Sequence, residues 1–205
     1  MTRWRFCDDR GQAFPLYAVF IVMLLFVALA FFTIGKAGVV RSDAQGAADA
    51  AALGAAREAR DNLTPGIDLA ALSPQAWEDF LRGNMLGSGG CDAAGAFAAM
   101  NGATATCSQS GLRFTAAVVT NGTVGDSVVP GVSGQHGNAE ATAEIIPRCL
   151  LKQQESSDPG PSAEPKAPGR IEFECDKGAS VTFDPAQPRP WSALGRALFD
   201  IRLID

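Results

Sequence analysis

Residues 13–34 read AFPLYAVFIVMLLFVALAFFTI, and none of these 22 side chains carries a charge. As an α-helix the run would be about 33 Å long at 1.5 Å per residue. The hydrocarbon core of a bilayer is about 30 Å thick, so a helix of this length can cross it. Pro15 falls in the first helical turn, where its missing N–H costs little, and Tyr17 lies near one edge, where interfacial aromatic residues are common. The run predicts a transmembrane helix over 13–34.

Basic residues flank the apolar run on both sides. Arg3, Arg5 and Arg10 precede it, and Lys36 and Arg41 follow it. Basic residues collect on the cytoplasmic side of membrane proteins, and more of them precede the run than follow it closely. This difference favours a single-pass protein of the cell membrane with a cytoplasmic N-terminus and an extracytoplasmic C-terminal domain.

Two other readings of the run stay open. The triplet at Ala28–Ala30 imitates the small-residue cleavage site of a secretory signal, although Phe31 and Phe32 continue the apolar run beyond it. A buried core helix is the second alternative.

The composition restricts the classes of function. The chain has 205 residues, 47% of them hydrophobic, a formal net charge of −5 and one histidine. Without a basic excess, nothing indicates a nucleic-acid partner. A single histidine argues against histidine-based catalysis or a histidine-rich metal site.

The five cysteines are divided by the apolar run. Cys7 precedes it, whereas Cys91, Cys107, Cys149 and Cys175 follow it. An even number in the larger part is typical of disulfides in an oxidising compartment. Four cysteines allow three connectivities, and proximity favours Cys91–Cys107 and Cys149–Cys175. No CxxC pair supports a zinc site, and free thiols are the remaining alternative.

An alanine-rich segment, 35–62, follows the apolar run, and we expect it to continue the helix to about residue 61, roughly 70 Å in all. Arg41, Gln45 and Asp49 would share a polar face. Another face carries small residues spaced 3, 4, 3, 4, 3, which predicts a seam for close packing against helices of partner proteins. A merely alanine-rich surface helix is the alternative. The seam consists of Ala37, Val40, Ala44, Ala47, Ala51 and Gly54.

Two stretches carry a family resemblance. DRGQAFPLYAVFIVMLL (9–25) and SDAQGAADAAALGAA (42–56) resemble the N-terminal region of TadE/TadG-like Flp pilus-assembly proteins, with Gln45 and Asp49 in the signature. The resemblance covers about residues 8–56. It implies a bacterial envelope protein, a structural or assembly component of a Tad/Flp-type pilus or related secretion apparatus.

The resemblance also raises the question of processing. Related pseudopilins are cut after a glycine and carry a glutamate at the fifth mature position. Here Gly11 and Gln12 form the candidate cleavage site, and the fifth position holds Leu16. A permanent membrane anchor is the other expectation.

The outer region reads as short helices and strands. We expect helices at 72–86, with Ser73 as N-cap, and at 91–100. Strands are expected at 111–123, ending in an Asn121–Gly122 turn, at 138–149, and in a hairpin of 170–175 and 179–184. Residues 190–205 read as a helix leading into a last strand. The fold class is therefore α+β: a long N-terminal transmembrane helix extending outward, then a small disulfide-bonded extracytoplasmic domain with antiparallel strands, which is a pilin-like layout.

The predicted organisation has six parts. They are a cytoplasmic leader (1–12), the transmembrane helix (13–34), its alanine-rich extension (35–62), an extracytoplasmic domain (63–150), a Pro/Ser-rich linker or loop (151–170), and the C-terminal strands and helix of the same domain (171–205).

No motif indicates catalysis. His136 and Ser133 fall in a glycine-rich loop, and alternate glutamates, Glu140 with Glu144 and Glu172 with Glu174, are typical of solvated strand faces. We expect no enzyme activity, cofactor, metal or small-molecule substrate. The expected partners are the membrane and, through the N-terminal helix, other pilus or secretion-system proteins. A membrane-tethered binding module unrelated to pili is the alternative, and a secreted enzyme is a third.

Overall fold

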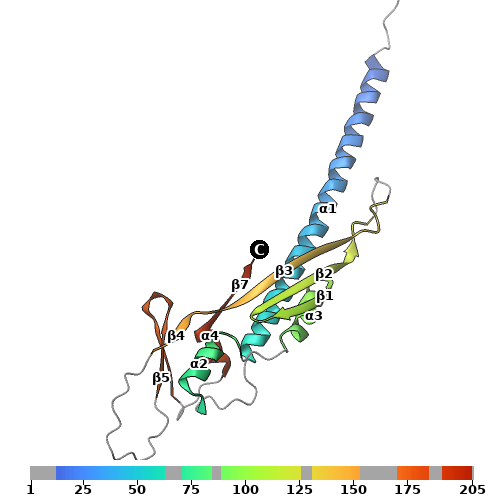
Figure 1. Cartoon of the computed structure of the whole chain (residues 1–205). Coiled ribbons are helices and arrows are strands. Elements are labelled where there is room, and N and C mark those ends of the chain that lie inside the picture. The colour runs from blue at the N-terminus through green and yellow to red at the C-terminus, as the bar shows by residue number, and fades with distance from the viewer. Residues whose placement is uncertain are drawn as a thin grey trace, which may run out of the picture.

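A computed structural model describes residues 13–62, 71–84, 89–125, 131–152, 170–184 and 191–204 (Figure 1). Its longest element is α1, a helix of 49 residues from Ala13 to Asp61. At 1.5 Å per residue α1 is about 73 Å long. The N-terminal half of α1 stands away from the other elements, and its C-terminal half lies along a β-sheet (Figure 1). One unbroken helix therefore joins the apolar run to the folded domain, and the predicted α+β class is confirmed.

The main sheet has four antiparallel strands in the order β1-β2-β3-β7. Their bounds are Ala103–Ser110 for β1, Arg113–Thr123 for β2, His136–Pro147 for β3 and Phe199–Ile204 for β7. Three strands follow one another in sequence, and the last strand of the chain adds to the edge of β3. The sheet is thus completed by pairing between parts of the chain that are distant in sequence.

One face of this sheet is covered by helices. α1 and α3 (Cys91–Met100) pack against it and against each other. Because successive side chains of a strand point to opposite faces, alternate residues of each strand enter this layer. The buried residues of the sheet include Ala103, Phe114, Ala116, Val118, Ala141, Ala143, Ile145 and Phe199.

A second, smaller group of elements lies at the end of the domain far from the apolar run (Figure 1). It comprises α2 (Pro74–Leu81), α4 (Trp191–Leu198) and a three-stranded antiparallel sheet in the order β4-β5-β6. The strands are β4 (Cys149–Leu151), β5 (Ile171–Cys175) and β6 (Ser180–Phe183), with a 3-10 turn at Asp176–Gly178 between the last two. The predicted 170–184 hairpin is present.

Aromatic rings join this group to the main sheet. The ring of Trp77 lies 5.2 Å from that of Phe173, centroid to centroid, and 5.6 Å from that of Phe80. Phe80 in turn lies 5.5 Å from Phe199 of β7. The Ser73 hydroxyl accepts a hydrogen bond from the N–H of Ala76 at 3.2 Å, so it caps α2 as the sequence predicts.

Two local expectations are wrong. Asn121 and Gly122 do not form a turn but lie inside β2, where the register shifts between Val119 and Thr123. The strand pairing continues beyond them, since the Val124 N–H donates to the Gln135 carbonyl at 3.0 Å. A β-bulge therefore takes the place of the expected turn. His136 begins β3 rather than lying in a loop, and its Nδ1 is 2.6 Å from the Thr120 carbonyl oxygen.

Candidate functional site: an exposed apolar helix joined to a buried alanine stripe

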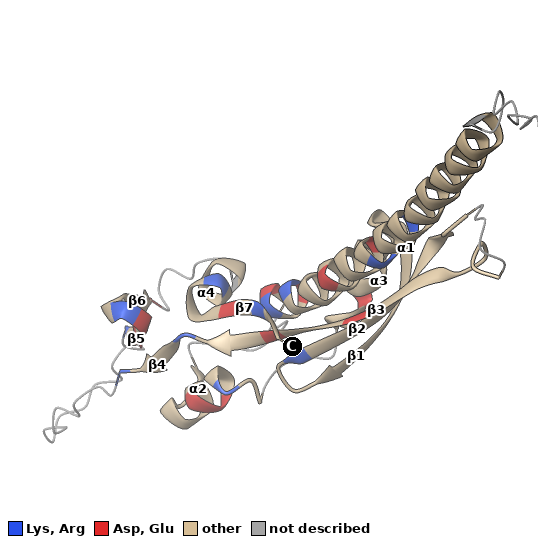
Figure 2. Ribbon diagram, turned by 90° about the horizontal axis from the view of Figure 1, so that it is seen from above, with Lys and Arg blue, Asp and Glu red and all other residues tan. Residues whose placement is uncertain are grey.

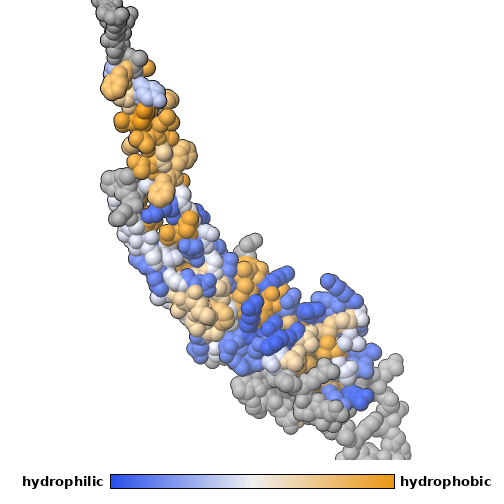
Figure 3. All heavy atoms as spheres, turned by 180° about the vertical axis from the view of Figure 1, so that it is seen from behind, coloured by the Kyte–Doolittle hydropathy of each residue, from blue (hydrophilic) through white to orange (hydrophobic). Residues whose placement is uncertain are grey.

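The first part of α1 exposes nearly all of its large apolar side chains. Phe14 is 80% exposed, Phe26 69% and Phe31 71%. Among the described residues, α1 is the one helix long and apolar enough to cross a membrane. The orange cylinder in Figure 3 shows this segment projecting from the more hydrophilic domain, and Figure 2 shows no charged residue along it. An apolar surface of this extent is far larger than the patches that soluble monomers expose.

The second part of α1 carries a buried stripe of alanines. These side chains lie at 0% exposure and face the sheet and α3. Because a methyl group is small, the sheet can approach the helix axis closely along the whole stripe. The stripe consists of Ala44, Ala47, Ala48, Ala51, Ala52, Ala55 and Ala56.

The stripe corrects the expectation that the small-residue seam contacts other proteins. Four members of the seam, Ala44, Ala47, Ala51 and Gly54, are buried inside this chain. Val40 is half-buried, and Ala37 alone is exposed. The seam is a packing surface, but at these four positions its partner is the domain's own sheet and α3.

Glycines complete the close packing around α1. A Cβ added at Gly137 of β3 would lie 2.5 Å from the Val40 carbonyl oxygen, and one at Gly90 would lie 2.7 Å from the Ala55 carbonyl oxygen. A Cβ at Gly54 would overlap the ring of Phe97 in α3. Strand β3 and helix α3, the latter also through its N-cap residue Gly90, thus contact α1 where only hydrogen fits. Sequence reasoning missed Gly90 and Gly137, because the position of a glycine in the sequence does not reveal which residue it will contact.

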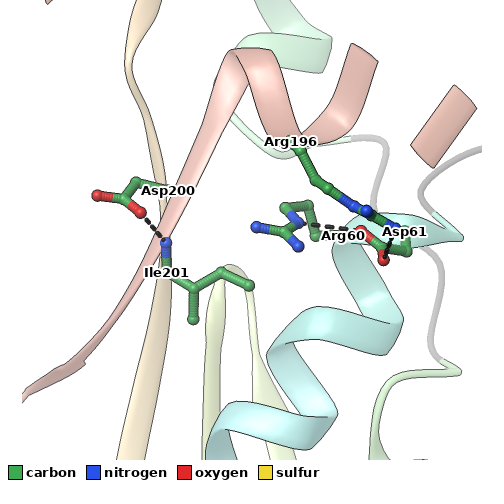
Figure 4. A network of polar contacts seen from close by, with 5 residues as sticks. All are labelled: Arg60, Asp61, Arg196, Asp200 and Ile201. Atoms are coloured by element: carbon green, nitrogen blue, oxygen red, sulfur yellow. Dashed lines mark hydrogen bonds and ion pairs between the residues drawn. The ribbon is translucent and has the colours of Figure 1, made fainter. Parts of the chain in front are cut away.

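The far end of α1 is held by polar contacts (Figure 4). Asp61 accepts from Arg60 Nε and from Arg196 Nη2 of α4, each at 3.1 Å. Gly195 lies beside the same turn, where an added Cβ would be 3.0 Å from the Arg60 carbonyl oxygen. These contacts fix α4 on the last turn of α1, at the opposite end from the apolar segment.

The two signature residues lie on the other side of the helix. Gln45 is exposed, Asp49 is half-buried, and Gln45 Nε2 donates to Asp49 Oδ1 at 2.8 Å. On the exposed part of α1, a Cβ at Gly35, Gly38 or Gly46 would meet no atom of the described residues within 4 Å. This face of α1 is therefore open and made of small and polar groups.

Two disulfides hold the domain, in the pairing that proximity in the sequence favours. Cys91–Cys107 joins the start of α3 to β1, and Cys149–Cys175 joins β4 to β5. The candidate cleavage site Gly11–Gln12, Cys7, the rest of the leader and most of the predicted linker, 153–169, lie outside the described residues.

The polar groups considered in the sequence form surface contacts. Glu144 on the exposed sheet face pairs with Arg113 at 2.9 Å and Arg202 at 3.7 Å. Glu172 pairs with Lys152 at 3.2 Å. Within the described parts of the chain, no three His, Cys, Asp or Glu side chains gather in a way that could hold a metal ion.

Comparison with known proteins gives one family match, and it falls on this helix. Residues 11–58 match the model of the Tad family, the TadE/G-like Flp pilus-assembly proteins. No curated protein and no solved structure matches the chain. The matched residues contain both the exposed apolar segment and the buried alanine stripe. The N-terminal region of this chain is therefore similar to TadE/G-like Flp pilus-assembly proteins, which supports a role in pilus assembly.

Proposed function

We propose that this protein is a membrane-anchored structural or assembly component, similar to a minor pseudopilin, of a Tad/Flp-type pilus or a related secretion apparatus. One observation carries the proposal: the residues of the family match are those that form the exposed apolar helix and attach the outer domain to it. The apolar segment crosses the membrane once, with the N-terminus in the cytoplasm and the disulfide-bonded domain outside.

The continuity of α1 gives this arrangement a mechanical consequence. The helix runs from Ala13 to Asp61 without a break, and its outer half is packed against the sheet by the alanine stripe. A movement of the membrane segment is therefore passed to the domain as a movement of one rigid body. An assembly component needs this property if it is shifted within the membrane during assembly.

Partner proteins contact the surfaces of α1 that the domain leaves free. These are the apolar segment itself and the open face that carries Gly38, Ser42, Gln45 and Gly46. Small residues let a second helix approach closely, so this face suits another membrane helix continuing outward. This replaces the seam residues Ala44, Ala47 and Ala51 as the expected contact surface.

The partner surface can be tested with three matched Gly→Leu variants. Gly38→Leu and Gly46→Leu place a bulky side chain on the open face of α1, and Gly95→Leu places one on the exposed side of α3. At each of these positions an added Cβ meets no atom within 4 Å in the part of the chain that the structure describes. We expect the two α1 variants to lose co-purification with membrane proteins of the pilus machinery and to reduce piliation, whereas Gly95→Leu retains both. Retention by all three variants would exclude this face as the contact.

The orientation has its own test. The side chain of Cys7 precedes the membrane segment, so a membrane-impermeant maleimide should label it only after the cells are opened. Labelling of Cys7 in intact cells would reverse the proposed topology. The intact mass of the membrane-bound protein tests processing, since cleavage after Gly11 leaves Gln12 as the first residue.

A further inference from the structure

We propose that the end of the β2–β3 hairpin rests on the membrane surface beside α1, as a second contact with the bilayer that fixes the tilt of the domain. This inference rests on the proposed membrane span. The surface is defined as the hairpin end, residues 124, 125 and 131–135, the described residues between β2 and β3. In Figure 1 the β2–β3 hairpin extends along α1 toward the apolar segment, beyond the rest of the sheet.

The hairpin end is held in place against α1. The Gly125 N–H donates to the Ser133 carbonyl at 3.1 Å, which continues the pairing of the two strands beyond β2. A Cβ built at Gly125 would lie 3.6 Å from Lys36 Nζ, so this part of the hairpin lies directly beside the first charged residue after the apolar run. The pairing of β2 with β3 and the packing of both strands on α1 therefore set how far the hairpin end reaches along the helix.

The covered face of α1 extends into the apolar run. Ala44 is buried, Val40 and Lys36 are half-buried, and Thr33, on the same face one turn earlier, is only 8% exposed. The neighbouring Phe32 and Ile34 are 60% and 68% exposed. Burial on this one face of α1 thus extends to the last turn of the uncharged run.

The lengths of the apolar run and of the hydrocarbon core place Lys36 and Gly125 at the membrane surface. The uncharged run is about 33 Å long as a helix and a hydrocarbon core is about 30 Å thick, so the run has little length to spare. Lys36 lies only two residues, about 3 Å, beyond Ile34, the end of the run. The Gly125 backbone beside Lys36 is therefore at the depth of the lipid headgroups.

The chemistry of the hairpin end fits that layer. The described residues of the hairpin end carry no charge and include two valines, Val124 and Val132. Lys36, whose ammonium lies 5.6 Å from the centre of the Phe32 ring, is placed to reach lipid phosphates while its stem stays along the helix. The partner that suits an uncharged hairpin with a lysine beside it is the headgroup region of a bilayer.

Site-specific quenching in lipid nanodiscs tests the inference on the full chain. Single cysteines are introduced in a Cys7→Ser background, and each carries an environment-sensitive fluorophore. The three positions are Ser133→Cys at the hairpin end, Ser110→Cys at the opposite end of the sheet, and Leu25→Cys inside the span. All three side chains are exposed, and intact mass checks that both disulfides remain. Lipids carry a nitroxide either at the headgroup or in the middle of the acyl chain.

We expect the headgroup nitroxide to quench the label at residue 133 several times more strongly than the label at residue 110. The mid-chain nitroxide should quench residue 25 most. If residue 133 is quenched no more than residue 110 while residue 25 is quenched, the hairpin contact is excluded and the span stands. If residue 25 escapes quenching as well, the membrane span itself fails and the inference fails with it.

Discussion

Gly137 of β3 and Val40 of α1 meet where the sheet first touches the helix, and a Cβ on residue 137 would lie 2.5 Å from the Val40 carbonyl oxygen. The same Cβ would lie 3.0 Å from the Cβ of Ala44. The backbone of Gly137 is fixed from the other side, since its N–H donates to Thr120 Oγ1 at 2.8 Å. The Gly137 backbone thus lies between α1 and Thr120 of β2, with no room for a Cβ.

Gly137→Ala should therefore destabilise the domain by about 1–3 kcal/mol, the usual cost of overpacking a tight contact. Urea unfolding of the full chain in detergent, followed by tryptophan fluorescence, measures the loss. Gly134→Ala is the matched control, because a Cβ there meets no described residue within 4 Å. Alanine also restricts the unfolded chain more than glycine does, so this variant should be as stable as the wild type or slightly more stable. Equal stability of the two variants would contradict the proposed close contact.

The alanine stripe makes a second prediction within one helix. Ala51 is fully buried, whereas a Cβ at Gly46 would meet none of the residues that the structure describes within 4 Å. Ala51→Leu should cost about 1–3 kcal/mol because the sheet and α3 must move away. Gly46→Ala should gain about 0.5–1 kcal/mol from the higher helix propensity of alanine.

Thermal unfolding of both variants in detergent checks these opposite signs. The two variants are closely matched, because both changes add carbon atoms to the same helix at positions five residues apart. If Ala51→Leu unfolds at the wild-type temperature, the stripe is not packed against the domain, and the original expectation of an intermolecular seam would return.

The disulfides should differ in their rate of reduction. Cys149 and Cys175 are 2% and 7% exposed, whereas Cys91 and Cys107 are half-buried. Since thiol–disulfide exchange needs access to a sulfur atom, mild reductant should open Cys91–Cys107 first in the folded protein. Alkylation at successive times and peptide mass spectrometry give the order. Simultaneous labelling of all four cysteines would mean that global unfolding, not access, controls the reduction.

Much of the fold can be predicted from two properties of the sequence. The charge-free run and the alanines after it predict a helix over 13–61, and the structure has α1 over the same residues. Nearness along the chain predicts the disulfide pairs, because short loops close at the lowest entropic cost. Both inferences concern local features, for which neighbouring residues decide the outcome.

The remainder depends on contacts between distant residues. β1 has the sequence ATATCSQS, in which the alternating residues are all small or polar, so the contrast between its two faces is too weak to indicate a strand. Asn121 and Gly122 favour a turn locally, but the pairing of Thr123 with His136 keeps them in a bulge. The seam shows that something packs closely on α1, and only the fold reveals that the partner is the chain's own sheet and α3.

The exposed apolar segment of α1 gives the last prediction, with two leucines as a matched pair. Leu25 lies in the middle of the exposed apolar segment, and Leu150 of β4 is 76% exposed on the domain. Leu25→Arg should weaken membrane insertion, since an arginine near the centre of a span costs about 2.5–3.5 kcal/mol on insertion scales. Leu150→Arg places the same charge in water and should insert normally. Carbonate extraction of cell membranes, with immunoblotting of pellet and supernatant, separates the outcomes: Leu25→Arg should shift toward the supernatant while Leu150→Arg stays in the pellet. If both variants stay in the pellet to the wild-type extent, the central part of the apolar run does not determine anchoring, and the domain itself must hold the protein on the membrane.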